Sequence, residues 1–260
     1  MKNKPFVSVT GLVSVGEIDF VVKQFSNSYA KVSSHKPAIG FLVSEQTLKG
    51  ENHQNLRFPK LDNFAEVLLA RVPYNIENVI HYKTKNPATI ADDVSKLFTD
   101  FCDGSVCRVV QLNMPFNETD QLKILKDNNP TLSIALKIPN YDIKLREIAD
   151  KVCAYCDSIS YAMIELPEKR QQQNGVQTQL DLYKELASRC SNVTLGFTGG
   201  FSAWNVEDKV QDIIARVGTK DFCIDAVSGL RDKISDKKDD DVLDHKRVRE
   251  YLKSVALVLK

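Results

Sequence analysis

Residues 193–206 read VTLGFTGGFSAWNV, a short apolar run followed by a Gly-Gly pair and by an Asn-Val that opens an amphipathic segment. The run has the composition of a buried strand, and apolar residues recur at helical spacing through 206–217. Glycines at such a junction let the backbone approach a ligand closely and leave N–H groups pointing outward. The stretch therefore predicts a strand–turn–helix unit whose turn is suited to an anion.

The same unit recurs along the whole chain. Short β-rich runs alternate with segments of helical apolar spacing, and each helical segment follows its strand. Nearly continuous apolar strands are typical of parallel sheets that are buried on both faces. The eight expected strands are FVSVT (6–10), AIGFLVS (38–44), NVIHYK (78–83), CRVVQLN (107–113), LSIALKI (132–138), SISYAMIEL (158–166), VTLGFT (193–198) and FCIDAV (222–227).

Eight βα units favour a closed (β/α)₈ barrel of the α/β class, formed as one domain over residues 1–260 and ending in a helix at 245–257. A doubly wound sheet would require a glycine-rich G-x-G-x-x-G turn after the first strand, and TGLVSVG (10–16) lacks that spacing. Two polar stretches, 45–60 and 231–244, are expected as long loops. Both follow strands, so they should lie on the face where barrel enzymes carry their active sites.

The composition excludes several classes of protein. The chain has 260 residues, of which 43% are hydrophobic and 27% charged, with a formal net charge of +1. No strong field attracts nucleic acid or an acidic membrane, and no apolar run reaches the length of a membrane span. The N-terminal stretch reads as a first strand rather than a signal peptide. We therefore expect a cytoplasmic monomer or homodimer without nucleic-acid or membrane partners.

Six cysteines are too few for a disulfide scaffold in a chain of this length, so we expect reduced thiols. Cys153 and Cys156 form a lone CxxC, which is compatible with a redox pair or with half a zinc site completed by Cys102 and Cys107. The second pair lacks the two-residue spacing, and the CxxC ends a helical segment whose buried stripe accepts small apolar cysteines. The sequence thus favours core cysteines, with no metal and no cofactor.

Small residues end the last two predicted strands. TGG (198–200) ends the seventh and Ser228-Gly229 follows the eighth, and these strand ends are neighbours in a closed barrel. Backbone N–H groups there, with the positive end of a following helix, suit a phosphate dianion. Each glycine taken alone is typical of a tight turn, but the two adjacent pairs together favour a phosphate site.

Several segments, in the right order, resemble the phosphoribosylanthranilate isomerases, TIM barrels of tryptophan biosynthesis. The GGFSAWNVED segment is similar to a Gly-Gly…Asn-Val motif of that family, and IDAVSGL is similar to its last strand. The matching segments are VSVTGL (7–12), AIGFLV (38–43), VVQLN (109–113), GGFSAWNVED (199–208) and IDAVSGL (224–230). The resemblance implies that Gly199, Gly200, Ser228 and Gly229 bind a substrate phosphate, and that Arg57 meets a carboxylated aromatic ring.

The family's reaction is an Amadori rearrangement, an aldose-to-ketose isomerisation that needs a general acid and a general base. The resemblance places Glu165 as the acid at the end of the sixth strand, where apolar neighbours would raise its pKa. A salt bridge with Lys169 or Arg170 is the structural alternative for this residue. Thr10 stands where the family has its basic cysteine, and a hydroxyl is not a base near neutral pH.

Three functions fit this pattern. The first is an isomerase whose base is His81 or Asp225, two residues near strand ends. The second is a relative that binds a phosphorylated sugar derivative without catalysis. The third is a barrel enzyme that performs different chemistry on a phosphorylated substrate.

Overall fold

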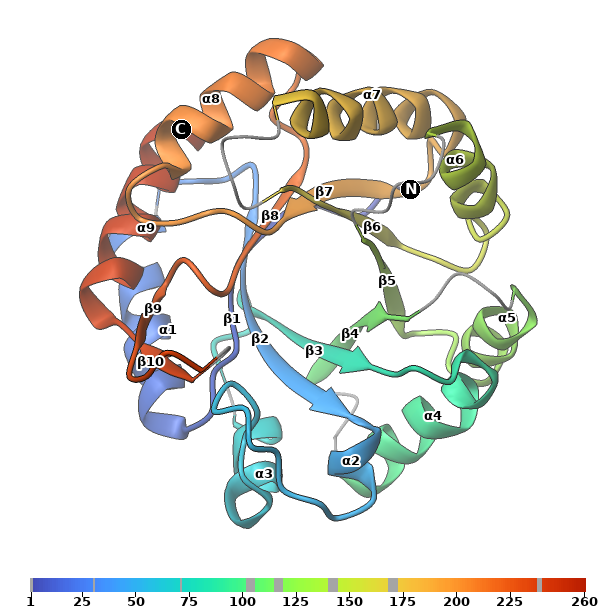
Figure 1. The fold of residues 1–260 in the computed structure, drawn as a ribbon, viewed down its shortest axis with the longest axis vertical. Coiled ribbons are helices and arrows are strands. Elements are labelled where there is room, and N and C mark those ends of the chain that lie inside the picture. Colours follow the sequence, from blue (N-terminus) through green and yellow to red (C-terminus); the bar gives the residue numbers. More distant parts are fainter. Residues whose placement is uncertain are drawn as a thin grey trace.

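The computed structural model describes residues 2–29, 31–70, 72–101, 106–114, 119–139, 145–167, 173–237 and 240–260. Eight parallel strands pair in chain order and the last pairs with the first, so the sheet closes into a barrel (Figure 1). They are β1 (Phe6–Thr10), β2 (Lys36–Ser44), β3 (Glu77–Lys83), β4 (Cys107–Asn113), β5 (Ser133–Ile138), β6 (Tyr161–Glu165), β7 (Thr194–Thr198) and β8 (Cys223–Ala226). The predicted (β/α)₈ barrel is confirmed.

Helices form a ring around this barrel (Figure 1). They are α1 (Val15–Tyr29), α2 (Glu45–Leu48), α3 (Leu61–Leu68), a 3₁₀ turn η1 (Pro87–Thr89), α4 (Ile90–Asp100), α5 (Thr119–Asn128), α6 (Leu145–Cys153), α7 (Gln173–Arg189), α8 (Val206–Val217) and α9 (His245–Leu259). The last helix packs between α8 and α1, which joins the two ends of the ring. Within the described ranges, no helix combines the length and the apolar character that a membrane crossing requires.

Two apolar clusters follow from the alternation of side chains along the strands. Residues pointing outward pack against the helices, as Val9, Ile39 and Ile80 do. The inward residues nearest the strand beginnings form a separate buried cluster: Phe6, Ala38, Val79, Val109, Ala135, Tyr161, Met163 and Cys223. The barrel is thus plugged by apolar side chains at the end where its strands begin.

Both stretches expected as loops contain short regular elements. After β2, Ser44 caps α2 by accepting the Gln46 N–H, within the stretch predicted at 45–60. After β8, two short strands within the charged stretch at 231–244, β9 (Arg231–Lys233) and β10 (Asp241–Leu243), pair in antiparallel orientation. The final helix also runs two residues beyond its predicted end at 257.

The expectation of reduced thiols is wrong for one pair. Cys156 lies three residues beyond the end of α6 and forms a disulfide with Cys190, which follows α7. Cys153 remains a free thiol and Cys107 is buried. Cys102, the other half of the second predicted pair, lies outside the described residues. Sequence spacing did not reveal the disulfide because packing of α6 against α7 brings its two cysteines together.

A single close contact in the barrel interior generates a stability prediction. Gly40 lies opposite Thr10, and a Cβ atom placed on Gly40 would lie 2.2 Å from Thr10 Oγ1. Gly40→Ala should therefore lower the free energy of unfolding by about 1–3 kcal/mol, as overpacking does in buried sites. Urea denaturation measures this change.

Gly16→Ala is the matched control, because Gly16 lies in α1 and its nearest atom to an added Cβ, Ser14 Oγ, is 4.0 Å away. Because Gly16 is the second residue of α1, alanine there should leave the free energy of unfolding unchanged or raise it by less than about 1 kcal/mol. Equal stability of Gly40→Ala and the parent would show that the Thr10 side chain does not restrict the space at residue 40.

Candidate functional site

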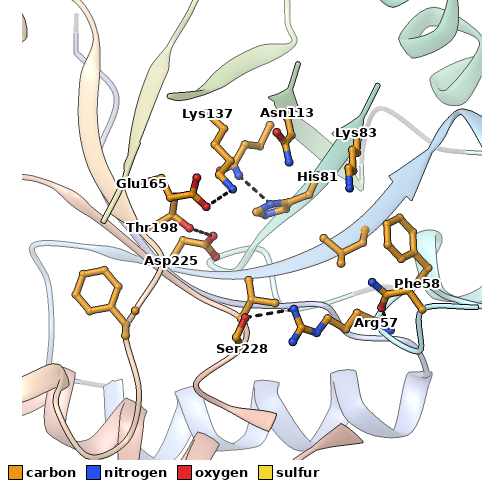
Figure 2. A pocket seen from close by; sticks show the side chains of 17 residues that line it. Arg57, Phe58, His81, Lys83, Asn113, Lys137, Glu165, Thr198, Asp225 and Ser228 are labelled. Carbon is orange, nitrogen blue, oxygen red and sulfur yellow. Dashed lines mark hydrogen bonds and ion pairs between the residues drawn. The ribbon is translucent and has the colours of Figure 1, made fainter. Parts of the chain in front are cut away.

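A cavity of about 280 Å³ opens where the strands end, opposite the apolar plug (Figure 2). The inward side chains change from apolar to polar along each strand toward this mouth. Val79 is followed two residues later by His81, Ala135 by Lys137, and Cys223 by Asp225. Since residues two apart on a strand share one face, the same register that fills the plug brings polar groups into the cavity.

Asp225 is buried at the base of this cavity and accepts hydrogen bonds from three hydroxyl groups. Its Oδ1 accepts hydrogen bonds from Ser8 Oγ at 2.6 Å and Thr10 Oγ1 at 2.7 Å, and its Oδ2 accepts one from Thr198 Oγ1 at 2.9 Å. These hydrogen bonds replace those that the carboxylate would make with water, and so offset the cost of burying its charge. Thr10 is fully buried and is not among the residues that line the cavity, whereas Asp225 is. The Thr10 hydroxyl therefore serves to hold Asp225.

His81 stands next to this cluster, and both of its ring nitrogens have partners. Nε2 lies 3.3 Å from Thr10 Oγ1 and Nδ1 lies 2.9 Å from Gln111 Nε2. Because the Thr10 hydroxyl donates to Asp225, its oxygen is left to accept the His81 Nε2–H. Burial lowers the pKa of His81 and outweighs the attraction of Asp225, so the imidazole is neutral near pH 7.

Glu165 reaches the mouth from the end of β6 and pairs with Lys137 on β5. Their Oε1 and Nζ atoms are 2.7 Å apart, with 33% of the Glu165 side chain exposed (Figure 2). The Glu165 carboxylate is thus paired with an ammonium group at the cavity surface. Its apolar neighbours Met163 and Ile164 are fully buried. Lys169 and Arg170, the partners weighed from the sequence, lie outside the described residues.

The Gly-Gly turn after β7 is held from behind by α8. Gly199 and Gly200 have φ angles of 81° and 63°, in the region that favours glycine, and both line the cavity. The Asn205 side chain accepts the Ser202 N–H and donates to the Gly200 carbonyl, to which Lys209 also donates. The turn is therefore fixed in shape directly before the N-terminus of α8.

Ser228 lines the cavity beside this turn, but Gly229 has a different role. Gly229 pairs with Ser202 in an isolated parallel bridge, and a Cβ atom there would lie 2.1 Å from the Phe201 carbonyl oxygen. The glycine therefore allows the loops after β7 and β8 to touch. Of the four residues predicted to contact phosphate, Gly199, Gly200 and Ser228 line one cavity and Gly229 packs behind them.

Arg57 lies on the same side of the mouth as Ser228, although it comes from the loop after β2. Its Nη1 donates to Ser228 Oγ at 3.2 Å and its Nε donates to Asp241 Oδ1 at 3.0 Å. Asp241 also accepts Arg231 Nε at 2.6 Å, and Arg231 Nη1 donates to the Gly11 carbonyl. Two guanidinium groups thus donate to the same carboxylate, and the network they form links the loop that carries Arg57 to the hairpin of β9 and β10.

Several residues that line the cavity were not predicted from the sequence. These residues are Lys83, Gln111, Asn113, Lys137 and Thr198. Each lies on a predicted strand and points inward at the mouth. The signal that would have found them is their register: each lies two or four residues beyond an inward apolar residue of the same strand, or at the strand's last position.

No protein-family model and no curated protein matches the sequence. Solved structures do resemble the fold. N-(5'-phosphoribosyl)anthranilate isomerase from Pyrococcus furiosus has a TM-score of 0.57 at 15% identity, covering 96% of this chain and 98% of that one. The phosphoribosyl anthranilate isomerase from Thermococcus kodakaraensis gives 0.59 and 16%, with 96% and 98% covered. TrpF from Jonesia denitrificans gives 0.60 and 14%, with 98% of both chains covered. These similarities establish a shared barrel fold over nearly the whole chain.

The shared carboxylate predicts a large effect of one substitution. Burial raises the pKa of Asp241, but hydrogen bonds from Arg57 and Arg231 outweigh burial and bring it below its usual value. Asp241→Asn should lower the free energy of unfolding by about 3–5 kcal/mol, because it removes the buried negative charge to which both guanidinium groups donate. Guanidinium chloride denaturation measures the loss.

Asp232→Asn in the same hairpin is the control, since Asp232 pairs with Arg247 and 52% of its side chain is exposed. Exposed pairs contribute about 1 kcal/mol or less. Similar losses in the two variants would show that the Asp241 network does not stabilise the mouth.

Proposed function

We propose that this chain is a cytoplasmic phosphoribosylanthranilate isomerase-like enzyme that performs an Amadori-type aldose-to-ketose isomerisation of a phosphoribosyl-amine in tryptophan biosynthesis. The observation that carries this proposal is that two carboxylates, Glu165 and Asp225, line one cavity together with the Gly199-Gly200 turn and Ser228. An acid, a base and an anion-binding turn are the three parts that this reaction requires. The similarity in fold to solved isomerases of this name supports the choice of reaction.

The phosphate end is proposed at the wall formed by the loops after β7 and β8. Gly199, Gly200 and Ser228 line it, and α8 begins six residues after Gly200. Arg57 adds a guanidinium group that already reaches Ser228 Oγ. A phosphate dianion bound there could accept charge-assisted hydrogen bonds from the Arg57 guanidinium group.

Glu165 is proposed as the general acid that protonates the ribose ring oxygen. Its carboxyl group is partly exposed to the cavity from the end of β6. Because Glu165 is ion-paired with Lys137, the proton is proposed to come from the ammonium group, 2.7 Å away, and to pass through the Glu165 carboxylate to the ring oxygen. The ion pair drawn in Figure 2 would thus act as the proton donor.

Asp225 is proposed as the general base that removes the proton from the carbon next to the anomeric centre. It lines the cavity, whereas Thr10, which stands at the family's cysteine position, lies beneath it. His81 is less suited as the base because both of its ring nitrogens are engaged, by Thr10 and by Gln111. The hydroxyl groups of Ser8, Thr10 and Thr198 position the Asp225 carboxylate.

The hydroxyl groups around Asp225 also favour a second candidate function. Asp225 is only 1% exposed and both of its carboxylate oxygens already accept hydroxyl donors, which limits its reach toward a substrate carbon. A relative that binds a phosphorylated sugar derivative without turnover would need the proposed phosphate site at Gly199, Gly200 and Ser228, but no base. Turnover separates the two candidates, and ligand binding alone does not.

Removal of the proposed acid tests the first candidate. Glu165→Gln should lower kcat with phosphoribosylanthranilate by at least about 10²-fold while ligand binding changes little, because the amide cannot donate the carboxyl proton. Steady-state kinetics with the purified variant measure this change. Glu147→Gln on the exposed face of α6 should leave kcat unaltered, and an unaltered kcat in Glu165→Gln would remove that residue from the mechanism.

The proposed phosphate site at Gly199, Gly200 and Ser228 is tested by ligand-induced stabilisation. Ribose 5-phosphate at about 100 times its dissociation constant should stabilise the parent by about 2.7 kcal/mol, seen as a higher Tm. Gly200→Val should abolish this shift, because the side chain enters the turn that lines the cavity. Gly218→Val is the matched control: Gly218 has a φ of 79° at the end of α8, so it suffers the same backbone strain away from the mouth.

Gly218→Val should lower the starting Tm but keep the ligand-induced rise. If Gly200→Val also keeps the rise, the two glycines act only as turn residues and the phosphate site is wrongly placed.

A further inference from the structure

Three cysteine sulfurs meet where α6 and α7 end, beyond the end of the barrel where strands begin. Cys153 is the last residue of α6, Cys156 lies in the turn that follows, and Cys190 follows α7. Their three Sγ atoms all lie within 4.8 Å of one another. Cys153 Sγ is 3.2 Å from Cys190 Sγ, and Cys190 is joined to Cys156 by the disulfide.

We propose that, once this disulfide is reduced, Cys153, Cys156 and Cys190 bind one thiophilic d¹⁰ metal ion such as Zn²⁺ or Cd²⁺, at a site separate from the barrel mouth. Metal–thiolate bonds of about 2.3 Å hold ligating sulfurs roughly 3.8 Å apart. The observed spacing falls within reach of that value through small side-chain rotations. Thiolates are also the protein ligands that soft cations prefer.

The local structure holds the three ligands in place. The CxxC spacing follows the end of a helix, and Asn192 Nδ2 donates to the Cys156 carbonyl at 3.0 Å, which ties the turn to the segment after Cys190. Arg189 bridges the two helices by donating to Asp150 at 2.8 Å. The sulfurs therefore stay neighbours whether or not a covalent bond joins two of them.

A divalent cation displaces the protons of the thiols that ligate it. With three protein ligands, a water molecule or an exogenous ligand occupies the fourth position of a tetrahedral ion.

Oxidation state controls access to this site. In the disulfide form, two of the three sulfurs are bonded to each other and only Cys153 remains as a thiol. Reduction by two equivalents of a small thiol adds two electrons and two protons, breaks the Cys156–Cys190 bond and leaves the reductant as its own disulfide. Metal and disulfide therefore exclude each other at these residues.

The test uses the full chain, reduced with a phosphine so that no thiol competes for metal, and Cd²⁺ as the probe. The reduced protein should take up one Cd²⁺ per chain with a thiolate-to-metal charge-transfer band, and the oxidised protein should take up none at this site. Circular dichroism of the same samples verifies the fold. Cys153→Ser and Cys190→Ser should each weaken binding by more than about 100-fold, beyond the loss seen for residues that only support metal ligands.

Cys107→Ala and Cys223→Ala serve as controls, because both residues are buried elsewhere. They should retain the single site. The proposal is overturned if the reduced, folded protein binds no Cd²⁺, if Cys153→Ser binds it as tightly as the parent, or if reduction alone unfolds the chain. These outcomes do not involve the phosphosugar cavity.

Discussion

Every side chain on a closed barrel strand points either to the inside or to the helices, and this two-residue alternation decides what the molecule can do. The inward positions are apolar where the strands begin and polar where they end, as in the change from Val79 to His81 and from Ala135 to Lys137. A shift of one residue in any strand would exchange its inner and outer faces. The plug and the cavity are therefore products of the same register.

Charge at the mouth is arranged on two sides. Glu165 pairs with Lys137 on the β5–β6 side, whereas Arg57 and Arg231 both donate to Asp241 on the other. Arg57 also donates to Ser228, beside the loops after β7 and β8. The cavity thus has a carboxylate of β6 on one side and a guanidinium group on the other.

The strand pattern was readable from the sequence because buried parallel strands leave a local apolar signal: the predicted strand at 107–113 matches β4 in full. That Gly199 and Gly200 lie at the mouth could be predicted because strand ends and glycines are also local features. What the sequence did not reveal depends on contacts between distant segments. Arg57 meets Ser228 across the mouth, Thr10 lies beneath the cavity because Asp225 holds its hydroxyl, and Cys156 finds Cys190 through the packing of two helices.

If the two carboxylates at this mouth turn over a phosphoribosyl-amine, the chain should replace phosphoribosylanthranilate isomerase in a bacterial tryptophan auxotroph that lacks this enzyme. Growth without tryptophan is the decisive readout, since it requires turnover as well as binding. The parent chain should support growth, and Asp225→Asn at equal protein level should not. Failure of the folded, well-expressed parent to support growth would show that these carboxylates do not catalyse the isomerisation.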